Sequence, residues 1–182
     1  MPPIARPALS SASRGLALHL RARTFATSKS KKASNQIHNS IVYPADLHSY
    51  QLLSSTSNQP LITLWTASWC RTCHTVSPLL KSIIESGIGE EEGGVQYANV
   101  EFDAPDIMGN GSESLAMRYM ITSIPTLLSF DGENTGERVM DARKLTDREF
   151  LEDWVRNQAR KNGGGGGGGQ GSVLGGLFGS LR

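Results

Sequence analysis

The sequence contains little cysteine, no acidic residue in its first segment, and no long apolar run in that segment. Two cysteines in 182 residues exclude the disulfide-dense scaffold of a small secreted domain. The apolar run Leu16–Leu20 is interrupted by His19 and is far too short to span a bilayer. We therefore expect neither a secreted disulfide framework nor a transmembrane segment.

Charge is distributed unevenly along the chain. No acidic residue precedes Asp46, although 7 of the 18 Lys and Arg residues do. The remainder of the chain carries 11 basic against 17 acidic residues, a net charge of −6. An acidic folded part has no electrostatic attraction to phosphate backbones, so we expect no nucleic-acid partner.

The basic first segment has the composition of an organellar address. Residues 1–35 are rich in Arg, Ser and Ala and lack acids, which is typical of a transit peptide. The segment Arg23-Thr24-Phe25-Ala26 resembles the arginine-directed cleavage site of mitochondrial presequences. We predict a mitochondrial protein, in the matrix. A plastid address and an uncleaved basic tail are the alternatives.

The other end of the chain, residues 161–182, is dominated by glycine. Residues 163–182 contain 11 glycines, seven of them consecutive, which predicts a flexible tail. The apolar residues beyond the glycines would share one face if that segment were helical, so a docking peptide is the alternative reading.

Between these ends, residues 36–160 alternate strand-like and helix-like segments. We place Asp46 and Ser112 at helix N-caps, and Thr146 with Glu149 in a capping box that opens the last helix. Helical crossovers imply parallel strands, and a turn at Asp131-Gly132-Glu133 adds a hairpin. The prediction is a three-layer α/β/α domain with a central mixed sheet. Its strands are expected at 37–42, 61–65, 95–102, 126–130 and 138–140, and its helices after Asp46, over 70–84, over 112–119 and after Thr146.

The two cysteines lie in the segment Trp69-Cys70-Arg71-Thr72-Cys73, between a buried strand and a helix. A helix N-terminus offers unpaired N–H groups and partial positive charge, which favour a thiolate at Cys70. A thiolate there would attack a substrate disulfide, and Cys73, one turn deeper, would resolve the mixed disulfide. The spacing predicts thiol–disulfide exchange.

Two other chemistries fit a cysteine pair less well. Zinc needs four ligands, and the chain has no second pair of cysteines, so we expect no metal. Cys70 through His74 also matches the attachment pattern of c-type haem. We expect no bound cofactor, because the strand before the pair and the Ile124-Pro125 loop further along the chain account for the site.

Several separated segments resemble the thioredoxin family. They are Ala67–Cys73 with Pro78 five residues further on, Val100–Asp103, and Ser123–Leu128. The resemblance implies a thioredoxin-like fold, a Cys70–Cys73 disulfide, and a cis bond before Pro125. It also implies that Ile124 pairs its backbone with the substrate chain, while Trp69 shields the cysteines and contacts substrate. Partners would be protein disulfides and an electron donor, either an external reductase or a small thiol.

The sequence also departs from the family at several of these positions. Arg71-Thr72 stand where common thioredoxins have Gly-Pro, and His74 stands where they have lysine. We expect these three residues to tune the site, with the Arg71 cation stabilising the thiolate. The family's buried acid and its lysine partner fall at Leu64 and Asn99.

These departures leave a second function open. The chain reads either as an oxidoreductase that reduces protein disulfides or as a thioredoxin-fold adaptor with non-catalytic cysteines. An insertion at 108–114 near the expected site, with the tail, would serve an adaptor as a docking segment. We expect the protein to be a monomer.

Overall fold

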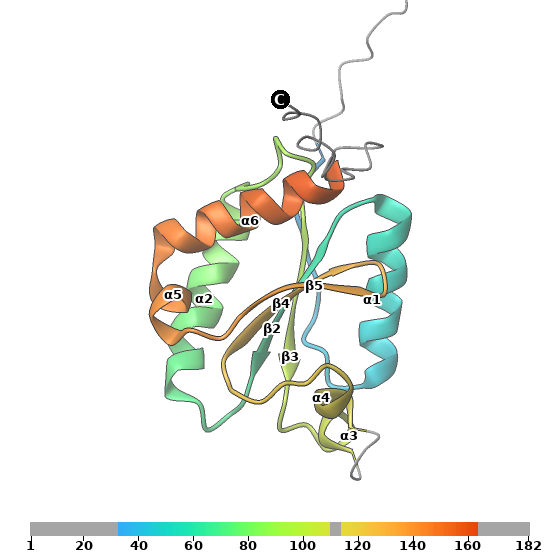
Figure 1. Cartoon of the computed structure of the whole chain (residues 1–182), viewed down its shortest axis with the longest axis vertical. Coiled ribbons are helices and arrows are strands. Elements are labelled where there is room, and N and C mark those ends of the chain that lie inside the picture. Colours follow the sequence, from blue (N-terminus) through green and yellow to red (C-terminus); the bar gives the residue numbers. More distant parts are fainter. Residues whose placement is uncertain (1–32, 110–113, 164–182) are drawn as a thin grey trace, which may run out of the picture. The chain divides into compact units, whose positions relative to one another are not determined.

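The computed structural model describes residues 33–109 and 114–163. Its five-stranded sheet has the order β1-β3-β2-β4-β5 and carries helices on both faces (Figure 1). The prediction of a three-layer α/β domain with a mixed sheet is confirmed. The strands are β1 (Gln36–Ile37), β2 (Leu61–Thr66), β3 (Gln96–Glu101), β4 (Thr126–Asp131) and β5 (Asn134–Val139).

Strand β2 lies at the centre of the sheet. It pairs in parallel with β3 and antiparallel with β4, and every residue from Leu61 to Trp65 is buried. A strand covered on both faces reads as a continuous apolar run rather than an alternation, which is why the sequence located it correctly. Its carboxyl end delivers the chain to the two cysteines.

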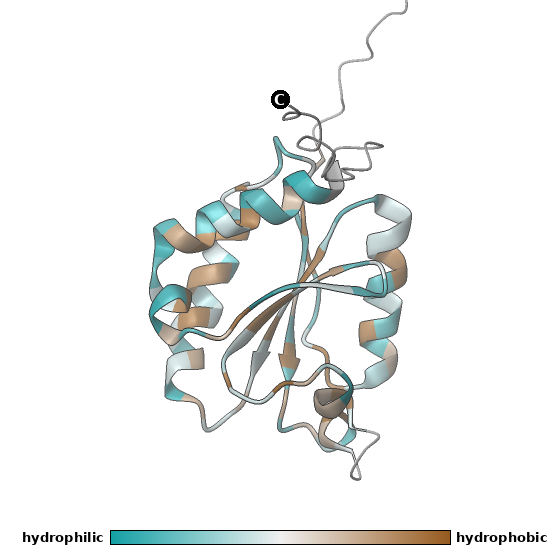
Figure 2. Ribbon diagram, viewed as in Figure 1, coloured by the Kyte–Doolittle hydropathy of each residue, from teal (hydrophilic) through white to brown (hydrophobic). Residues whose placement is uncertain are grey.

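Two helical layers cover the sheet. Helices α2 (Arg71–Glu85), α5 (Ala142–Thr146) and α6 (Arg148–Gly163) pack on one face. Helices α1 (Pro44–Ser57), α3 (Pro105–Met108) and α4 (Leu115–Arg118) pack on the other. Figure 2 shows apolar residues concentrated on the strands and alternating with polar ones along the helices. This alternation is the pattern of elements that bury one side only.

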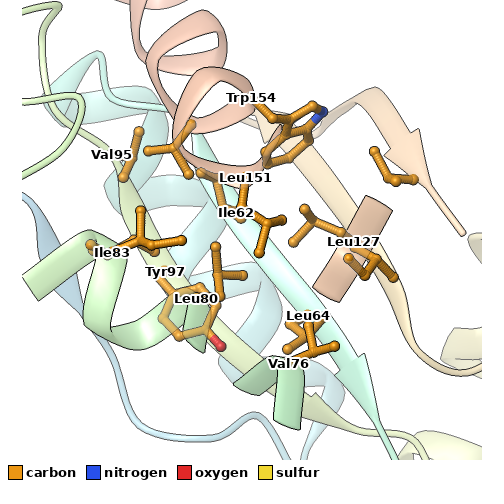
Figure 3. Close-up of a cluster of buried hydrophobic side chains, with 14 of the residues drawn as sticks. Ile62, Leu64, Val76, Leu80, Ile83, Val95, Tyr97, Leu127, Leu151 and Trp154 are labelled. Carbon is orange, nitrogen blue, oxygen red and sulfur yellow. The ribbon is translucent and has the colours of Figure 1, made fainter. Parts of the chain in front are cut away.

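The largest hydrophobic cluster among the described residues lies under α2 and α6. Leu151 and Trp154 of α6 lie over Ile62, and Val76 of α2 lies beside Leu64 (Figure 3). Full burial of each aliphatic side chain stabilises the fold by about 1.5–3 kcal/mol. This core holds α2, and with it the cysteines, against the central strand.

The first strand and the first helix differ from the prediction. Only Gln36–Ile37 pair as a strand, and Ile41 adds an isolated bridge to Val100. Helix α1 begins at Pro44 with Tyr43 as its N-cap, so the assignment of Asp46 as N-cap is wrong. Proline suits the first helical position, because its N–H would be unpaired there and its φ is already helical. Asp46 instead lies in the first turn.

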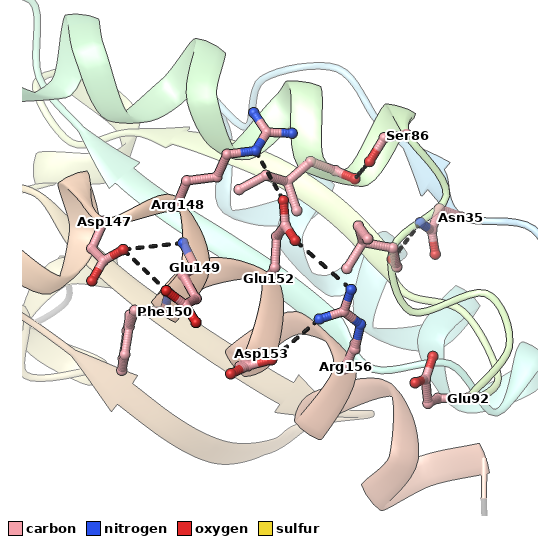
Figure 4. A network of polar contacts seen from close by, with 12 residues as sticks. Asn35, Ser86, Glu92, Asp147, Arg148, Glu149, Phe150, Glu152, Asp153 and Arg156 are labelled. Atoms are coloured by element: carbon pink, nitrogen blue, oxygen red, sulfur yellow. Dashed lines mark hydrogen bonds and ion pairs between the residues drawn. The ribbon is translucent and has the colours of Figure 1, made fainter.

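The predicted cap of the last helix also differs from the structure. The capping box of Thr146 is wrong, because Thr146 ends α5 and its hydroxyl donates to the carbonyls of Ala142 and Arg143. Asp147 caps α6 and accepts from the backbone N–H groups of Glu149 and Phe150, at 3.0 and 3.4 Å (Figure 4). An aspartate at this position also opposes the helix dipole.

For the short fourth helix, Ser114 provides the cap, with its hydroxyl accepting from the N–H of Met117 at 3.1 Å. The predicted cap Ser112 lies outside the described residues, as does most of the predicted insertion. The hairpin after Asp131 is confirmed, with β5 starting four residues earlier than predicted. The residues from Asn134 to Glu137 are exposed and polar, so they carry little apolar signal.

The predicted transit peptide and glycine tail lie almost wholly outside the described residues. At the near boundary, the Asn35 side chain donates to the carbonyls of Ile84 and Ile88, at 2.9 and 2.8 Å, and accepts from the N–H of Val95. Asn35 is thus bound to the domain, one residue before the predicted boundary (Figure 4). Within the described residues, no helix has the length and apolarity needed to cross a membrane.

Candidate redox site

Cys70 is the N-cap of α2 and follows directly after a turn. The backbone N–H of Cys73 donates to the Cys70 sulfur at 3.1 Å and to the Cys70 carbonyl at 3.1 Å. A first-turn N–H aimed at sulfur, together with the helix dipole, favours negative charge on that sulfur. In the structure the two cysteines form a disulfide, with their Cα atoms 5.3 Å apart.

The disulfide is nearly covered, while its neighbour Trp69 is open to solvent. Cys70 and Cys73 are 6% and 3% exposed, whereas Trp69 is 69% exposed. An aromatic side chain with this exposure next to the cysteines offers a large apolar contact surface. The exposed indole of Trp69 thus lies one residue before the covered disulfide.

Ile124 and Pro125 reach the cysteines from a distant part of the chain. Ile124 packs against the cluster that contains Cys70 and Cys73, and the Ile124–Pro125 peptide bond is cis. Pairing of β4 with β2 ends at Thr126. Among the described residues, no hydrogen bond involves the backbone of Ile124. Its N–H and C=O groups are thus unpaired beside the disulfide.

The turn before Cys70 is held by an aspartate that follows β3. The Asp103 carboxylate accepts from the backbone N–H of Ser68 at 2.9 Å and from its hydroxyl at 2.5 Å. These two hydrogen bonds lower the pKa of Asp103, because they stabilise its charged form. They tie the ends of β2 and β3 together next to the site.

The three residues expected to tune the site lie in the first turn of α2. Arg71 and His74 are exposed and Thr72 is half-buried. None of the three side chains has a hydrogen bond or ion pair with another described residue. A tuning effect of these side chains on the cysteines would have to act through space and solvent.

Leu64 and Asn99 are register partners between β2 and β3. Leu64 is fully buried. The Asn99 side chain accepts from the Tyr97 hydroxyl at 2.6 Å and donates to the Ser77 hydroxyl at 3.0 Å. Burial raises the pKa of Tyr97, so its hydroxyl stays neutral. A neutral hydrogen-bonded group thus occupies the place beneath α2.

A comparison of the sequence with family models matches the model of thioredoxin over residues 42–156. The chain belongs to the thioredoxin family. Its Cys70–Cys73 pair makes it a thiol–disulfide oxidoreductase.

Individual relatives agree with this thioredoxin assignment. The chain is 27% identical over 135 residues to probable thioredoxin-2 of Caenorhabditis elegans, a match that covers 74% of this chain and 83% of that protein. It is 32% identical over 83 residues to thioredoxin of Pyropia yezoensis, covering 46% of this chain and 64% of that one.

Among solved structures, Fasciola hepatica thioredoxin superposes with a TM-score of 0.51 at 19% identity, over 68% of this chain and 98% of that one. This likeness establishes the fold.

Sequence reasoning named Asn99 only as the position of the family's lysine, and it missed the hydrogen bonds that hold polar residues next to the cysteines. Ser68 and Asp103 hold the turn before Cys70, and the buried Tyr97 forms a polar group with the half-buried Asn99 and Ser77. One signal was available, because polar residues recur at every second position of β3 from Tyr97 to Glu101, which is how one face of a strand is marked. In the described ranges, no three His, Cys, Asp or Glu side chains gather as metal ligands.

Proposed function

We propose that this protein reduces disulfide bonds in other proteins, with Cys70 as the attacking thiolate and Cys73 as the resolving thiol. The observation that carries the proposal is the position of the Cys70 sulfur. It caps α2, accepts the N–H of Cys73 at 3.1 Å and lies in one cluster with Ile124. A helix N-terminus beside an unpaired backbone segment suits attack on an extended substrate.

The reaction starts from the dithiol form. The Cys70 thiolate attacks one sulfur of the substrate disulfide, forming a mixed disulfide and expelling the other substrate sulfur as a thiolate. Cys73 then loses its proton and attacks the Cys70 sulfur. The Cys70–Cys73 bond forms, the bond to the substrate breaks, and the second substrate sulfur leaves as a thiolate. Both electrons of the enzyme dithiol pass to the substrate.

Substrate orientation falls to Trp69, Ile124 and Pro125. An extended segment would pair with the unbonded N–H and C=O of Ile124 as an added strand. Pro125 is buried and carries no N–H, so the donor for this pairing has to come from Ile124. Trp69 would cover the substrate from the opposite side of the disulfide.

Each cycle leaves the protein oxidised, as in the structure. Its electrons would then come from an external reductase or from a small thiol, and neither route needs a cofactor bound to this chain. The exposed cation of Arg71 favours the thiolate and hence the reduced form.

The test is reduction of insulin by a reduced small thiol, followed as turbidity, with the wild type, Cys70→Ser and Cys73→Ser. We expect no catalysis by Cys70→Ser, and a trapped mixed disulfide with Cys73→Ser. His48→Asn, on the opposite face of the sheet in α1, is the control and should match the wild type. Equal turbidity rates with wild type and Cys70→Ser would refute the proposal.

The trap also decides between enzyme and adaptor. In an adaptor with inert cysteines, partners would bind to Cys73→Ser without a covalent bond, and reducing agent would release none of them. In an exchange enzyme, partners would be linked through Cys70 and released by reduction. The position of Cys70 as the N-cap of α2, with its sulfur accepting from the N–H of Cys73, favours exchange.

We also propose that residues 1–35 direct the protein to the mitochondrial matrix. Support comes from the absence of acids before Asp46 and from the arginine-directed cleavage pattern at residues 23–26. Residues 1–35 fused to a reporter should enter isolated mitochondria only while these are energised, and should be shortened there. The same segment with its arginines changed to glutamine is the control. Import into plastids alone would contradict the proposal.

A further inference from the structure

A cleft of about 450 Å³ opens on the Cys73 side of the disulfide. Cys73 lines it and Cys70 does not. Although Cys73 is only 3% exposed, this cleft connects it with polar side chains of β2, β3 and the first turn of α2. The polar residues that line it include Thr66, His74, Asn99, Glu101 and Asp103. A cleft of this size has room for several waters.

The inner wall of the cleft holds no proton acceptor. Asn99 is neutral and is engaged by the Tyr97 hydroxyl and by Ser77. Tyr97 stays protonated, because burial raises its pKa. Strand β2 lines the cleft with Thr66, which does not titrate, and the residue opposite Asn99 in the ladder is the buried, apolar Leu64. A proton leaving Cys73 therefore has no base behind it.

Besides Cys73, the cleft is lined by three titratable groups, namely His74, Glu101 and Asp103. One of them, Asp103, is already hydrogen-bonded. Asp103 follows β3 and holds two hydrogen bonds from Ser68. Those bonds lower the pKa of Asp103, which makes it a poorer proton acceptor. Glu101 ends β3, and His74 lies in α2 next to Cys73. Their side chains have no hydrogen bond or ion pair within the described residues.

We propose that the cleft is the route by which the Cys73 thiol loses its proton, with His74 as the acceptor and Glu101 as the counter-charge. The proposal rests on the proposed function. In the mixed disulfide, the Cys73 proton passes through water in the cleft to the neutral imidazole. The resulting thiolate attacks the Cys70 sulfur, and the substrate sulfur leaves as a thiolate. The imidazolium, which shares the cleft with Glu101, then returns its proton to solvent.

The chemistry favours this pair for a simple reason. Imidazole is the side chain best suited to accept and release a proton near neutral pH. A carboxylate in the same cleft stabilises the imidazolium without taking the proton itself. The other nearby charge, Arg71 of α2, lies outside the lining of the cleft and next to Cys70. It therefore acts on the first thiolate rather than on this proton.

The test separates the two chemical steps in one stopped-flow trace. Reduced protein is mixed with an aromatic disulfide that releases one coloured thiolate when Cys70 attacks and a second when Cys73 resolves. His74→Asn and Glu101→Gln are compared with the wild type from pH 5.5 to 9. The matched controls are His48→Asn and Glu133→Gln, a second His–Glu pair, 3.5 Å apart, on the other face of the sheet.

We expect His74→Asn to slow the second release about tenfold at pH 7, less than the roughly 10²–10⁴-fold of direct acid–base catalysis because water mediates the transfer. The imidazole inflection in the pH profile of that release should disappear. Glu101→Gln should slow it about threefold by removing the counter-charge. The first release should keep its amplitude in every variant, and the controls should match the wild type.

Two results would overturn the inference while leaving the proposed function intact. One is a second release by His74→Asn with the rate and pH profile of the wild type. The other is equal slowing by the His48→Asn control. If the wild type itself gave no first release, attack by Cys70 would be absent, and the proposed function would fail together with the inference.

Discussion

Leu64 and Asn99 lie opposite each other in the parallel ladder of β2 and β3, one fully buried and apolar, the other hydrogen-bonded to Tyr97 and Ser77. A charge at Leu64 would have no water around it, whereas Asn99 lines the cleft beside Cys73. The two residues are therefore an uncharged pair beneath α2, at the positions where the family resemblance places an acid and a lysine.

Leu64→Asp should destabilise the domain by about 3–5 kcal/mol, because a carboxylate without a partner would be buried in the core. Urea unfolding measures the loss. Leu64→Asn is the matched control, because asparagine has the size of aspartate and carries no charge. The double variant that also carries Asn99→Lys should lose less stability than the two single variants together. The difference should be at least about 1 kcal/mol in the free energy of unfolding. Strictly additive losses would show that the two positions do not interact.

Removal of the Ser68 hydroxyl should weaken the brace before Cys70 and change the stability of the domain at acid pH. The folded-state pKa of Asp103 lies below its ordinary value of 3.8. The contact is therefore fully stabilising above about pH 4 and is lost as the pH falls through the lower folded-state value. Ser68→Ala should unfold more easily than wild type at pH 7, and the gap should narrow by pH 2.5. A gap independent of pH would contradict this account.

Arg71→Ala should make the Cys70–Cys73 disulfide harder to reduce. An exposed cation next to the thiolate stabilises the reduced form by about 0.5–1 kcal/mol, which corresponds to a potential lower by roughly 10–20 mV in the variant. Equilibration against a glutathione buffer measures the potential. Lys81→Ala is the control, because Lys81 is an exposed cation of the same helix that pairs with Glu85 about three turns away. A potential unchanged by Arg71→Ala would exclude the tuning role.

Glu137→Gln should loosen the attachment of the end of α6 to β5. The carboxylate accepts from Lys161 and from Gln158, both at 2.9 Å, and these contacts lower the pKa of Glu137. Because the group is partly exposed, we expect a loss of about 0.5–1 kcal/mol at pH 7. Hydrogen exchange near Gln158 should speed up, while exchange in α2 should not. Uniform acceleration would mean that the contact supports the whole fold.

Local patterns were sufficient for much of the architecture. The run from Leu61 to Trp65 is buried on both faces, and its nearly continuous apolar character predicts a buried strand from the sequence alone. The pair Cys70 and Cys73 lies at the start of a helix, as its neighbours indicate. Helix starts are predicted less well: the sequence favours Asp46 and Thr146 as caps, whereas Tyr43 and Asp147 cap α1 and α6. Several residues compete for each cap, and packing selects one.

That Cys70 and Cys73 lie one turn apart at a helix N-terminus follows from the amino-acid sequence, because their spacing and the strand before them act over a few residues. Their surroundings follow only from the folded chain. Ile124 reaches the pair because β4 returns antiparallel beside β2, and Asp103 reaches Ser68 because β3 ends beside β2. The cleft behind Cys73 arises the same way, since residues far apart in the chain meet only when strand register aligns them.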